Sequence, residues 1–528
     1  MFLDEPYNKL IYSPNRALSV RHRTNKSALK CQTYFLKNPS DCGRSDNGVA
    51  KRRVIGMQQT RTESDSFGAL EVPASALWGA QTARSLKFFA IGEQTMPMDI
   101  IRALAWLKWA AACVNMDLGL LAPAKARAIA NAARRVAQGE FDGEFPLSVW
   151  QTGSGTQSNM NVNEVLATLA AGELAQGEVP GMPVHPNDDV NLGQSSNDAF
   201  PSAMHIAVGL NAKARLLPAL DELRLACQSK AQALTAVVKV GRTHMQDATP
   251  VTLGQEFGGF DAQLALCQNS LQFALGAVHT LAMGATAVGT GLNTHPEFGP
   301  RVAARLADRL QLPLRQAENL FAALAGHEAL VAFHASLKML AIALTKIAND
   351  IRLMGSGPRA GLCELTLPQN EAGSSIMPGK VNPTQVEALT MVCAQVMGHD
   401  AAIGFAASQG QFELNVYKPL IALDVLDSMR LLADAMRSFT LHCLSGIEVN
   451  HARLAAALQS SLMLVTALAP HIGYERAALV ARHAETQGCS LREAALALGW
   501  VNAQQFDDWV DPHKMVGTLS GFSSLTEK

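Results

Sequence analysis

Five long runs of apolar residues at helical spacing constrain this chain more than any other feature of its sequence. They fall at roughly residues 200–240, 253–283, 327–354, 383–407 and 416–446, and each is far longer than the average globular helix of about 12 residues. Few segments alternate with the period of two that is typical of a half-buried strand. The spacing therefore predicts a mainly α protein built around a central bundle of five long helices.

These runs are apolar on more than one face of the helix that each would form. The stretch from Leu330 to Leu344, for example, places apolar side chains all around a helix. Charged residues make up only 17% of the chain, which is below the usual quarter for soluble domains. We therefore expect neighbouring copies of the chain to complete the burial of these helices in an oligomer.

The sequence divides into four parts. Residues 1–56 form a basic segment with eleven Lys/Arg against four Asp/Glu, residues 57–194 an N-terminal helical domain, residues 195–451 the central long-helix domain, and residues 452–528 a small C-terminal helical domain. Three interpretations of the basic segment stay open: an organellar transit peptide, a disordered tail, or non-native sequence translated ahead of a start at Met57. Its acidic residues and weak amphipathicity favour the last. A cytoplasmic location is expected, with an organellar one as the alternative.

Composition and charge exclude several classes of function. The formal net charge is −1 and no basic stripe follows residue 56, so we expect no nucleic-acid partner. The nine cysteines are scattered and form no CxxC pair, which suits reduced thiols better than zinc or iron–sulfur ligands, so we predict no metal and no cofactor. No run of 18 apolar residues lacks charge or repeated polar interruption, so no membrane span is expected.

Four segments rich in Gly, Ser, Thr and Asn lead directly into helical runs. Such segments place backbone N–H groups and hydroxyls at helix N-termini, where anions bind. The first, at residues 153–164, contains half of a dinucleotide-binding fingerprint, but the third glycine and a preceding strand are missing. Its Ser154 and Thr156 are donors with no carboxylate before Glu164, which suits a bound carboxylate better than a cation. A solvated loop is the alternative.

The second segment runs from residue 185 to residue 198, just before a helix that begins near residue 200. Asp198 suits the N-cap of that helix, and the two preceding serines, Ser195 and Ser196, exceed what capping requires. His185 alone would more often be structural than ligand-binding, and only its polar neighbours favour a binding role.

The third segment, residues 241–250, is a polar turn between two long helices and contains His244. A histidine there can take and give a proton near neutral pH. A surface turn histidine without function is the alternative. Thr252 with Gln255 predicts a capping box for the helix that follows.

The fourth segment, residues 373–387, nearly matches a phosphate-binding loop. Five residues separate its glycines instead of four, and Val381 follows the lysine where Ser or Thr would bind magnesium, which excludes an ATPase. Asn382 as N-cap and Pro383 as first helical residue predict a helix start. Lys380 beside such a start indicates a binding place for a dianion.

The sequence from residue 373 to residue 383, GSSIMPGKVNP, resembles the signature of the fumarase/aspartase superfamily, whose members eliminate across a bond to release fumarate. The other three segments follow in the order which that superfamily shows, and the resemblance extends from Met57 to about Gly517. The Arg-Thr-His at 242–244 and the Ser-Ser-Asn at 195–197 are more similar to class II fumarases than to aspartases. The resemblance implies reversible hydration of fumarate to L-malate, a step of the tricarboxylic acid cycle. An aspartate ammonia-lyase and a catalytically inactive homologue are the alternatives.

The resemblance also assigns roles to single residues. It implies that Ser374 removes a proton from the methylene carbon of malate, that His244 handles the proton on the departing hydroxyl, and that Glu387 is paired with the histidine. Backbone N–H groups of its own loop are expected to stabilise the Ser374 alkoxide. The implied substrate-binding residues are Ser154, Gly155, Thr156, Ser195, Ser196, Asn197, Thr243, Ser375, Lys380, Val381 and Asn382. A second carboxylate site near the entrance is implied at His185, Pro186, Asn187 and Asp188.

The implied architecture is a three-domain, mainly α chain whose five-helix bundles pack into the twenty-helix core of a homotetramer. Each active site would draw residues from three subunits, and a small dicarboxylate is the expected substrate. The chain departs from the family pattern at two places. Met182 stands where fumarases often carry a basic residue, which weakens the entrance site, and Leu192-Gly193 replaces a common Lys-Ser pair before the active-site serines.

Overall fold

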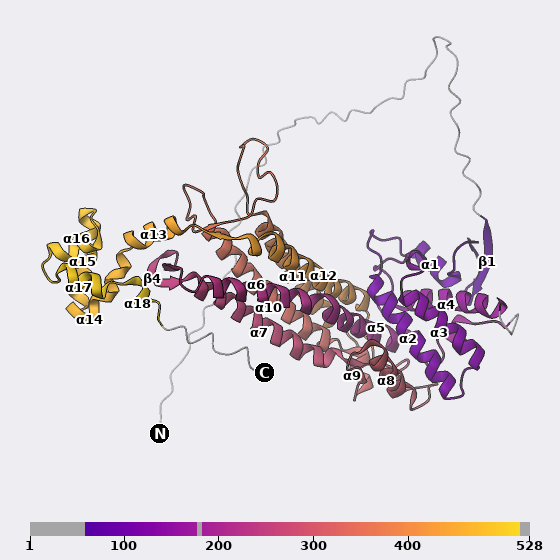
Figure 1. Cartoon of the computed structure of the whole chain (residues 1–528). Coiled ribbons are helices and arrows are strands. Elements are labelled where there is room, and N and C mark those ends of the chain that lie inside the picture. The colour runs from indigo at the N-terminus through magenta and orange to yellow at the C-terminus, as the bar shows by residue number, and fades with distance from the viewer. Residues whose placement is uncertain (1–58, 177–181, 518–528) are drawn as a thin grey trace, which may run out of the picture. The chain divides into compact units, whose positions relative to one another are not determined.

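The computed structural model describes residues 59–176 and 182–517, and within this part the chain is mainly helical (Figure 1). Its strands occur only as two-stranded pairs in the described residues. The predicted mainly α class is therefore confirmed. The basic segment predicted for residues 1–56 lies outside the described residues.

Five long helical elements form the central bundle that the apolar spacing predicts. Neighbouring members pack along their lengths, and their buried aliphatic and aromatic side chains belong to one hydrophobic core. α10 alone has 27 residues, which corresponds to a length of about 40 Å. The bundle consists of α6 (Leu217–Ala233), extended by α5 (Ser196–Asn211), together with α7 (Leu253–Val278), α10 (Glu328–Met354), α11 (Thr384–Ala407) and α12 (Lys418–His442) (Figure 1).

The run predicted at 200–240 is not one continuous helix. A π-helical turn at Ala212–Leu216 joins α5 to α6, and the backbone N–H of Leu217 bonds to the carbonyl of Ala212. Pro218 explains this turn, because it has no N–H to donate and its ring needs room beside the preceding turn of helix.

The end of the same run is a strand rather than a helix. β3 (Val238–Thr243) pairs antiparallel with β4 (Gln246–Thr252), because the valines around residue 238 favour extended backbone. α7 then begins with the predicted capping box, in which Thr252 and Gln255 bond to each other's backbone N–H groups. The third polar segment is therefore the tip of a hairpin.

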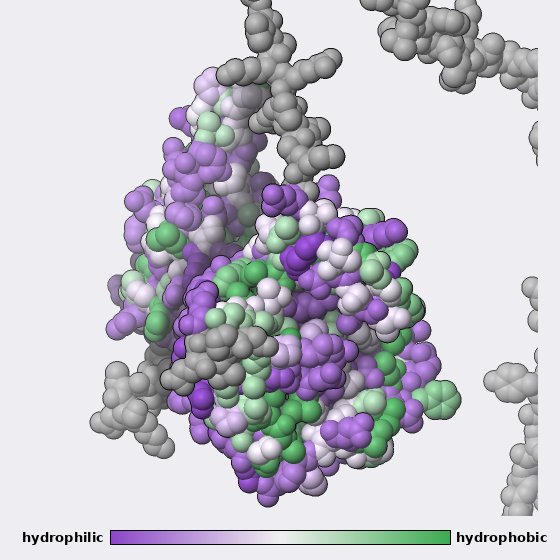
Figure 2. All heavy atoms as spheres, turned by 90° about the vertical axis from the view of Figure 1, so that its right-hand side faces the viewer, coloured by the Kyte–Doolittle hydropathy of each residue, from purple (hydrophilic) through white to green (hydrophobic). Residues whose placement is uncertain are grey.

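An N-terminal group of elements packs at the end of the bundle where α5 begins. α2 and α4 contact α5, and Figure 2 shows that the surface of this end mixes hydrophilic residues with scattered hydrophobic ones. The elements are β1 (Thr60–Asp65), β2 (Gly68–Pro73), α1 (Ala80–Phe88), α2 (Met98–Asp117), α3 (Pro123–Ala137) and α4 (Thr156–Gln176). Beside them lie α8 (Phe298–Leu310), α9 (Leu320–Ala325) and the short parallel pair β5 (Thr280–Leu281) and β6 (Arg315–Gln316).

The C-terminal elements have a small hydrophobic core of their own, built from residues between Leu464 and Phe506. They contact the β3–β4 hairpin at the opposite end of the bundle from α2 and α4 (Figure 1). The elements are α13 (His451–Ser460), α14 (Ala469–Ile472), α15 (Tyr474–Gln487), α16 (Leu491–Ala497), α17 (Ala503–Trp509) and α18 (Pro512–Met515). A short antiparallel pair, β7 (Leu365–Thr366) and β8 (Glu448–Val449), precedes them. The domain boundaries at residues 194 and 451 stay predictions.

In the described part of the chain, α10 is long and apolar enough to cross a membrane by length and composition alone, and the bent pair His451–Ser460 with Leu462–Ile472 would count as a second candidate. Of the most apolar window of α10, 56% is buried inside the protein. This burial is what the central position of α10 in the bundle requires.

Candidate functional site

The first two polar segments come together at one end of the bundle. Both contribute to the wall of a cavity of about 440 Å³ beside the N-termini of α4 and α5, which Thr286 and Asn293 complete. Thr156 represents the first segment in this wall, and the second contributes Ser195, Ser196 and Asn197. The hydroxyl and amide groups of these two segments therefore lie close together within a single chain.

The glycine of the first segment has a steric role. Gly155 has a φ of +75°, and a Cβ there would lie 2.3 Å from the ring of Phe200, so only glycine fits. Ser154 is nearly buried, and its hydroxyl is 2.8 Å from that of Thr156. The tight turn thus presents the Thr156 hydroxyl at the start of α4.

The N-terminus of α5 differs from the prediction that Asp198 is its cap. Ser195 is the N-cap, its hydroxyl oxygen accepting the backbone N–H of Asn197, while Asp198 at the third helical position accepts the N–H of Ser195. The other carboxylate oxygen of Asp198 accepts the N–H groups of Gly284 and Thr286. The aspartate is needed to hold this second loop, so the serine takes the capping place. Burial raises the pKa of Asp198 to about 6.

A buried polar cluster lies beneath this cavity. Lys108, on α2, has no exposed surface, and its Nζ donates to Asn191 Oδ1 at 2.7 Å. The same oxygen accepts from Asn159 Nδ2 at 3.3 Å and from Asn163 Nδ2 at 3.2 Å, both on α4. Asn159 Nδ2 also donates to Ser196 Oγ at 3.0 Å. Burial lowers the pKa of Lys108 to about 7, partly opposed by the charge of Asp198.

The third segment lies at the other end of the bundle. His244 and Met245 form the tip of the β3–β4 hairpin, both with positive φ, and the His244 side chain is exposed. Thr243, the other predicted residue of the segment, is also exposed.

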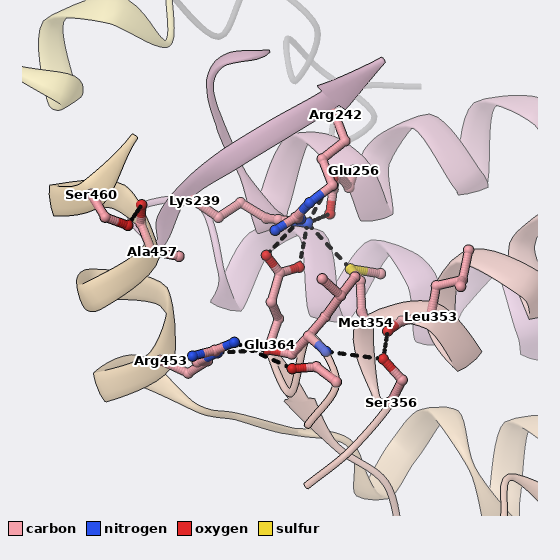
Figure 3. Close-up of polar contacts among 12 residues, drawn as sticks. Lys239, Arg242, Glu256, Leu353, Met354, Ser356, Glu364, Arg453, Ala457 and Ser460 are labelled. Atoms are coloured by element: carbon pink, nitrogen blue, oxygen red, sulfur yellow. Dashed lines mark hydrogen bonds and ion pairs between the residues drawn. The ribbon is translucent and has the colours of Figure 1, made fainter. Parts of the chain in front are cut away.

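Buried ion pairs fix the base of this hairpin (Figure 3). Glu364, with a side chain only 1% exposed, pairs with Arg242 at 2.7 Å and with Lys239 at 2.8 Å. Lys239 also pairs with Glu256 in the first turn of α7, at 2.9 Å. The carboxylate of Glu364 therefore joins β3, the strand that precedes His244, to the segment that leads into the fourth loop.

The fourth segment is an exposed loop that closes on itself. The amide of Asn382 donates to the carbonyl of Gly373, and a Cβ on Gly373 would lie 2.2 Å from the carbonyl oxygen of Lys380. The helix start predicted with Asn382 as N-cap and Pro383 as first helical residue is wrong by one residue: Pro383 takes the N-cap position and α11 begins at Thr384. The physical reason is that the Asn382 side chain closes the loop and is not free to cap a helix.

Ser374 forms two hydrogen bonds within this loop. Its Oγ accepts the backbone N–H of Met377 at 2.9 Å and of Ile376 at 3.2 Å. Two N–H donors aimed at one oxygen favour its negatively charged form. A cavity of about 420 Å³ in the loop is lined by Ser374, Lys380 and Val381, while Ser375 is exposed beside it.

The structure separates these two halves of the predicted site. The backbone N–H of Lys418, at the start of α12, bonds to the carbonyl of Gly153, whereas Ser438 near its end bonds to Gln385 at the start of α11. The distance along an α-helix from residue 418 to residue 438 is about 30 Å, at a rise of about 1.5 Å per residue. Ser154 and Ser196 therefore lie about this far from Lys380 in one chain. Glu387, exposed in the first turn of α11, forms no ion pair with any described residue.

The predicted entrance residues lie elsewhere on the surface. The ring Nδ1 of His185 accepts the N–H of Asp188 at 3.1 Å, while Pro186 and Asn187 begin a single π-helical turn. A cavity of about 700 Å³ is lined by His185 together with the acidic Glu63, Asp65 and Glu164. Among its described lining residues, His185 is the one that can carry positive charge.

Sequence reasoning missed the residues that support the site. Lys108 is a single charge in an otherwise apolar run, and Asn159 and Asn163 share one helix face at a spacing of four, so both signals were present. The partners of Glu364 lie more than a hundred positions away, at Lys239 and Arg242, and no local pattern indicates them. Among the described residues, no three His, Cys, Asp or Glu side chains converge as a metal-binding group.

The chain is similar to known proteins over most of its length. Residues 68–398 match the model of a family described as Lyase, and residues 464–517 match one described as Fumarase C C-terminus. The chain is 62% identical to a class II fumarate hydratase of Chromobacterium violaceum over 456 residues, covering 86% of this chain and 99% of that relative. It is 60% identical to that of Thermosynechococcus vestitus over 460 residues, covering 87% and 98% respectively.

Among solved structures, a class II fumarase from Schistosoma mansoni superposes with a TM-score of 0.84 at 45% identity. This match covers 87% of this chain and 99% of that one.

Proposed function

Because this chain belongs to the lyase family and, within it, to the class II fumarate hydratases, we propose that its four polar segments form the active site that interconverts fumarate and L-malate. The enzyme is a hydro-lyase of the fumarase type. The observation that carries the assignment of residues is the Ser374 hydroxyl, which accepts two backbone N–H groups beside a lysine in a self-closed loop.

In this proposal, Ser374 is the base that acts on carbon. Its alkoxide takes a proton from the methylene carbon of malate, and the electron pair left behind delocalises into the adjacent carboxylate. A serine is normally a weak base, and the N–H groups of Ile376 and Met377 supply the stabilisation that its negative form requires. The electron pair then returns to form the double bond as the hydroxyl departs.

His244 gives the departing hydroxyl a proton, so that it leaves as water. His244 is exposed at the tip of the hairpin, which supports a role in the site of a neighbouring chain. Glu387 is the carboxylate that pairs with this imidazole, and we propose that the pair forms between chains.

The carboxylates of the substrate require donors and a cation. Lys380 and Asn382 supply them from the fourth loop, with Ser375 and Val381 beside them, and Thr243 from the hairpin. Ser154, Gly155, Thr156, Ser195, Ser196 and Asn197 supply them from the cavity at the other end of the bundle. Donors aimed at the charge that develops on the intermediate lower the barrier more than donors that bind malate alone.

We propose that the chain acts as a homotetramer in which bundles pack into a twenty-helix core and each site draws on three subunits. The separation of about 30 Å supports this, since one chain cannot close its two halves into one pocket. Large apolar side chains exposed along the bundle also support it, among them Phe273 on α7, Ile342 on α10 and Met391 on α11. We propose that this enzyme is soluble and lies in the cytoplasm.

The residues around His185 remain a proposed second dicarboxylate site. Their acidic surroundings in the cavity make binding there depend on positive charge on His185. Met182, which packs against the hydrophobic core, supplies no second cation.

A single assay tests the function. We expect the absorbance of fumarate to appear with L-malate and not with L-aspartate. Fumarate from L-aspartate alone would assign an aspartate ammonia-lyase instead, and none from either substrate would assign an inactive homologue.

A further inference from the structure

We propose that Lys108 is a positioning residue that fixes the direction of the hydrogen bonds beneath the 440 Å³ cavity, so that Ser196 presents its hydroxyl proton to a substrate carboxylate. This inference deepens the proposed function and rests on it. Lys108 itself lies outside the cavity wall and acts through two asparagines.

The hydrogen bond from Lys108 to Asn191 has a fixed direction. The ammonium group of Lys108 has only donors, so the side chain of Asn191 must turn its oxygen toward it. An asparagine amide could otherwise sit in either of two orientations that differ little in shape. Lys108 favours the orientation in which Asn191 Nδ2 also donates to the carbonyl of Gln194, at 3.2 Å.

That selection passes to the next residue. Asn191 Oδ1 can only accept, so Asn159 and Asn163 must present their NH₂ groups to it. The NH₂ group of Asn159 also reaches Ser196, whose Oγ therefore acts as acceptor at 3.0 Å. Each step leaves one orientation.

The consequence appears at the cavity wall. With its oxygen accepting from Asn159, the Ser196 hydroxyl keeps its own proton, and it has no protein acceptor among the described residues. Ser196 lines the cavity, so this proton is available to a ligand there. A pocket that offers protons selects a carboxylate and disfavours a cation or another donor.

The buried position of Lys108 separates an orienting role for this lysine from a packing role. Taking Lys108 fully out of water is costly, because burial disfavours the charged form of its amine. A lysine kept only for packing would therefore be replaceable by methionine with no effect on binding. A lysine that orients the network would not.

The test is a double-mutant cycle on the full-length protein, with Lys108→Met and Ser196→Ala alone and combined. Binding of succinate, an unreactive C4 dicarboxylate, is measured by calorimetry. We expect Lys108→Met to weaken succinate binding about tenfold, the value of one hydrogen bond to a charged group. In the Ser196→Ala background the same change should alter the dissociation constant less than about twofold, because its effect passes through Ser196.

Asn159→Leu provides a second route to the same answer, since it removes the donor to Ser196 and leaves Lys108 in place. It should reproduce the loss and the same dependence on Ser196, and it replaces Lys108→Met in the cycle if that variant does not fold. Wild-type affinity in Lys108→Met, or an equal loss in both backgrounds, would overturn the inference. Succinate binding needs no turnover, so the two failures can be distinguished. A wild-type protein that does not convert malate would refute the proposed function, whereas the double-mutant cycle would still test the positioning role of Lys108.

Discussion

Complementation between two inactive variants should reveal whether the active site is shared. Ser374→Ala removes the proposed base at one end of the bundle, and Ser196→Ala removes a carboxylate donor at the other end, about 30 Å away along α12. If the two serines of a working site come from different chains, a mixed oligomer contains some sites in which both are intact.

The size of the effect follows from random assembly. In an equal mixture, half of the chains carry an intact Ser374 and the other half an intact Ser196. A site that takes these two residues from different chains therefore has both with a probability of about one quarter. A site built within one chain never has both, because every chain carries one substitution.

The assay is fumarate formation from L-malate after co-expression of the two variants with different affinity tags. The double-tagged oligomer is purified before measurement, which raises the fraction of mixed species. Activity well above the sum of the separate variants, approaching about a quarter of wild type, is expected. The matched control combines Ser374→Ala with Lys380→Met, because both residues lie in one loop and should enter a site together. Equal activity in both mixtures, or none in either, would refute the reasoning.

Three further outcomes are expected. Ser374→Ala and His244→Asn should each lower turnover by at least ~100-fold, the lower range for a positioned acid or base, and only Ser374→Ala should abolish exchange of the malate methylene proton with deuterated solvent. If only His244→Asn abolished this exchange, the two roles would have to be reversed. Glu364→Gln should lower the free energy of unfolding in urea by about 3 kcal/mol and also lower turnover, because it breaks a buried ion pair beneath the hairpin. Asp261→Asn, in a bundle ion pair away from the hairpin, should leave turnover unchanged. Equal turnover in both variants would count against a role for the ion pairs beneath the hairpin. Burial lowers the pKa of Lys108 to about 7, so above this pH the unfolded chain binds more protons than the folded one, and the folding stability contributed by this group rises from pH 7 toward pH 10. Lys108→Met should therefore stabilise the fold most near pH 6 and not at pH 10. Urea unfolding at the two pH values measures this difference.

Local patterns in the sequence predicted most of the fold. The apolar spacing located α7, α10, α11 and α12 to within a few residues at most of their ends, because long amphipathic helices carry many repeats of one signal. The capping box of Thr252 and Gln255 was equally predictable, since both partners lie within one turn. The π-helical turn before Pro218 and the strand β3 were missed because each depends on a few residues within a longer apolar run.

The candidate site was predictable only in its parts. Each polar segment carries its own signature, but the ion pairs of Glu364 and the network from Lys108 to Ser196 join residues that lie far apart in the chain. The hydrogen bonds of Lys108 also depend on its burial. A buried lysine must donate to protein acceptors, whereas an exposed one would donate to water. The sequence also contains no local pattern that indicates which end of the bundle in one chain packs against which end of the bundle in another.

The length of the bundle suggests how its two ends meet. A two-fold axis between antiparallel bundles brings the end of one chain that carries Ser196 against the end of another that carries Ser374, and it does so twice for each pair. Such packing needs apolar faces along the helices rather than at their tips, and Phe273, Ile342 and Met391 are exposed along α7, α10 and α11. The same apolar surface that would drive assembly would then also assemble the active site. Dilution to monomers should therefore abolish turnover even while the helices remain folded, which light scattering and circular dichroism can follow on one sample.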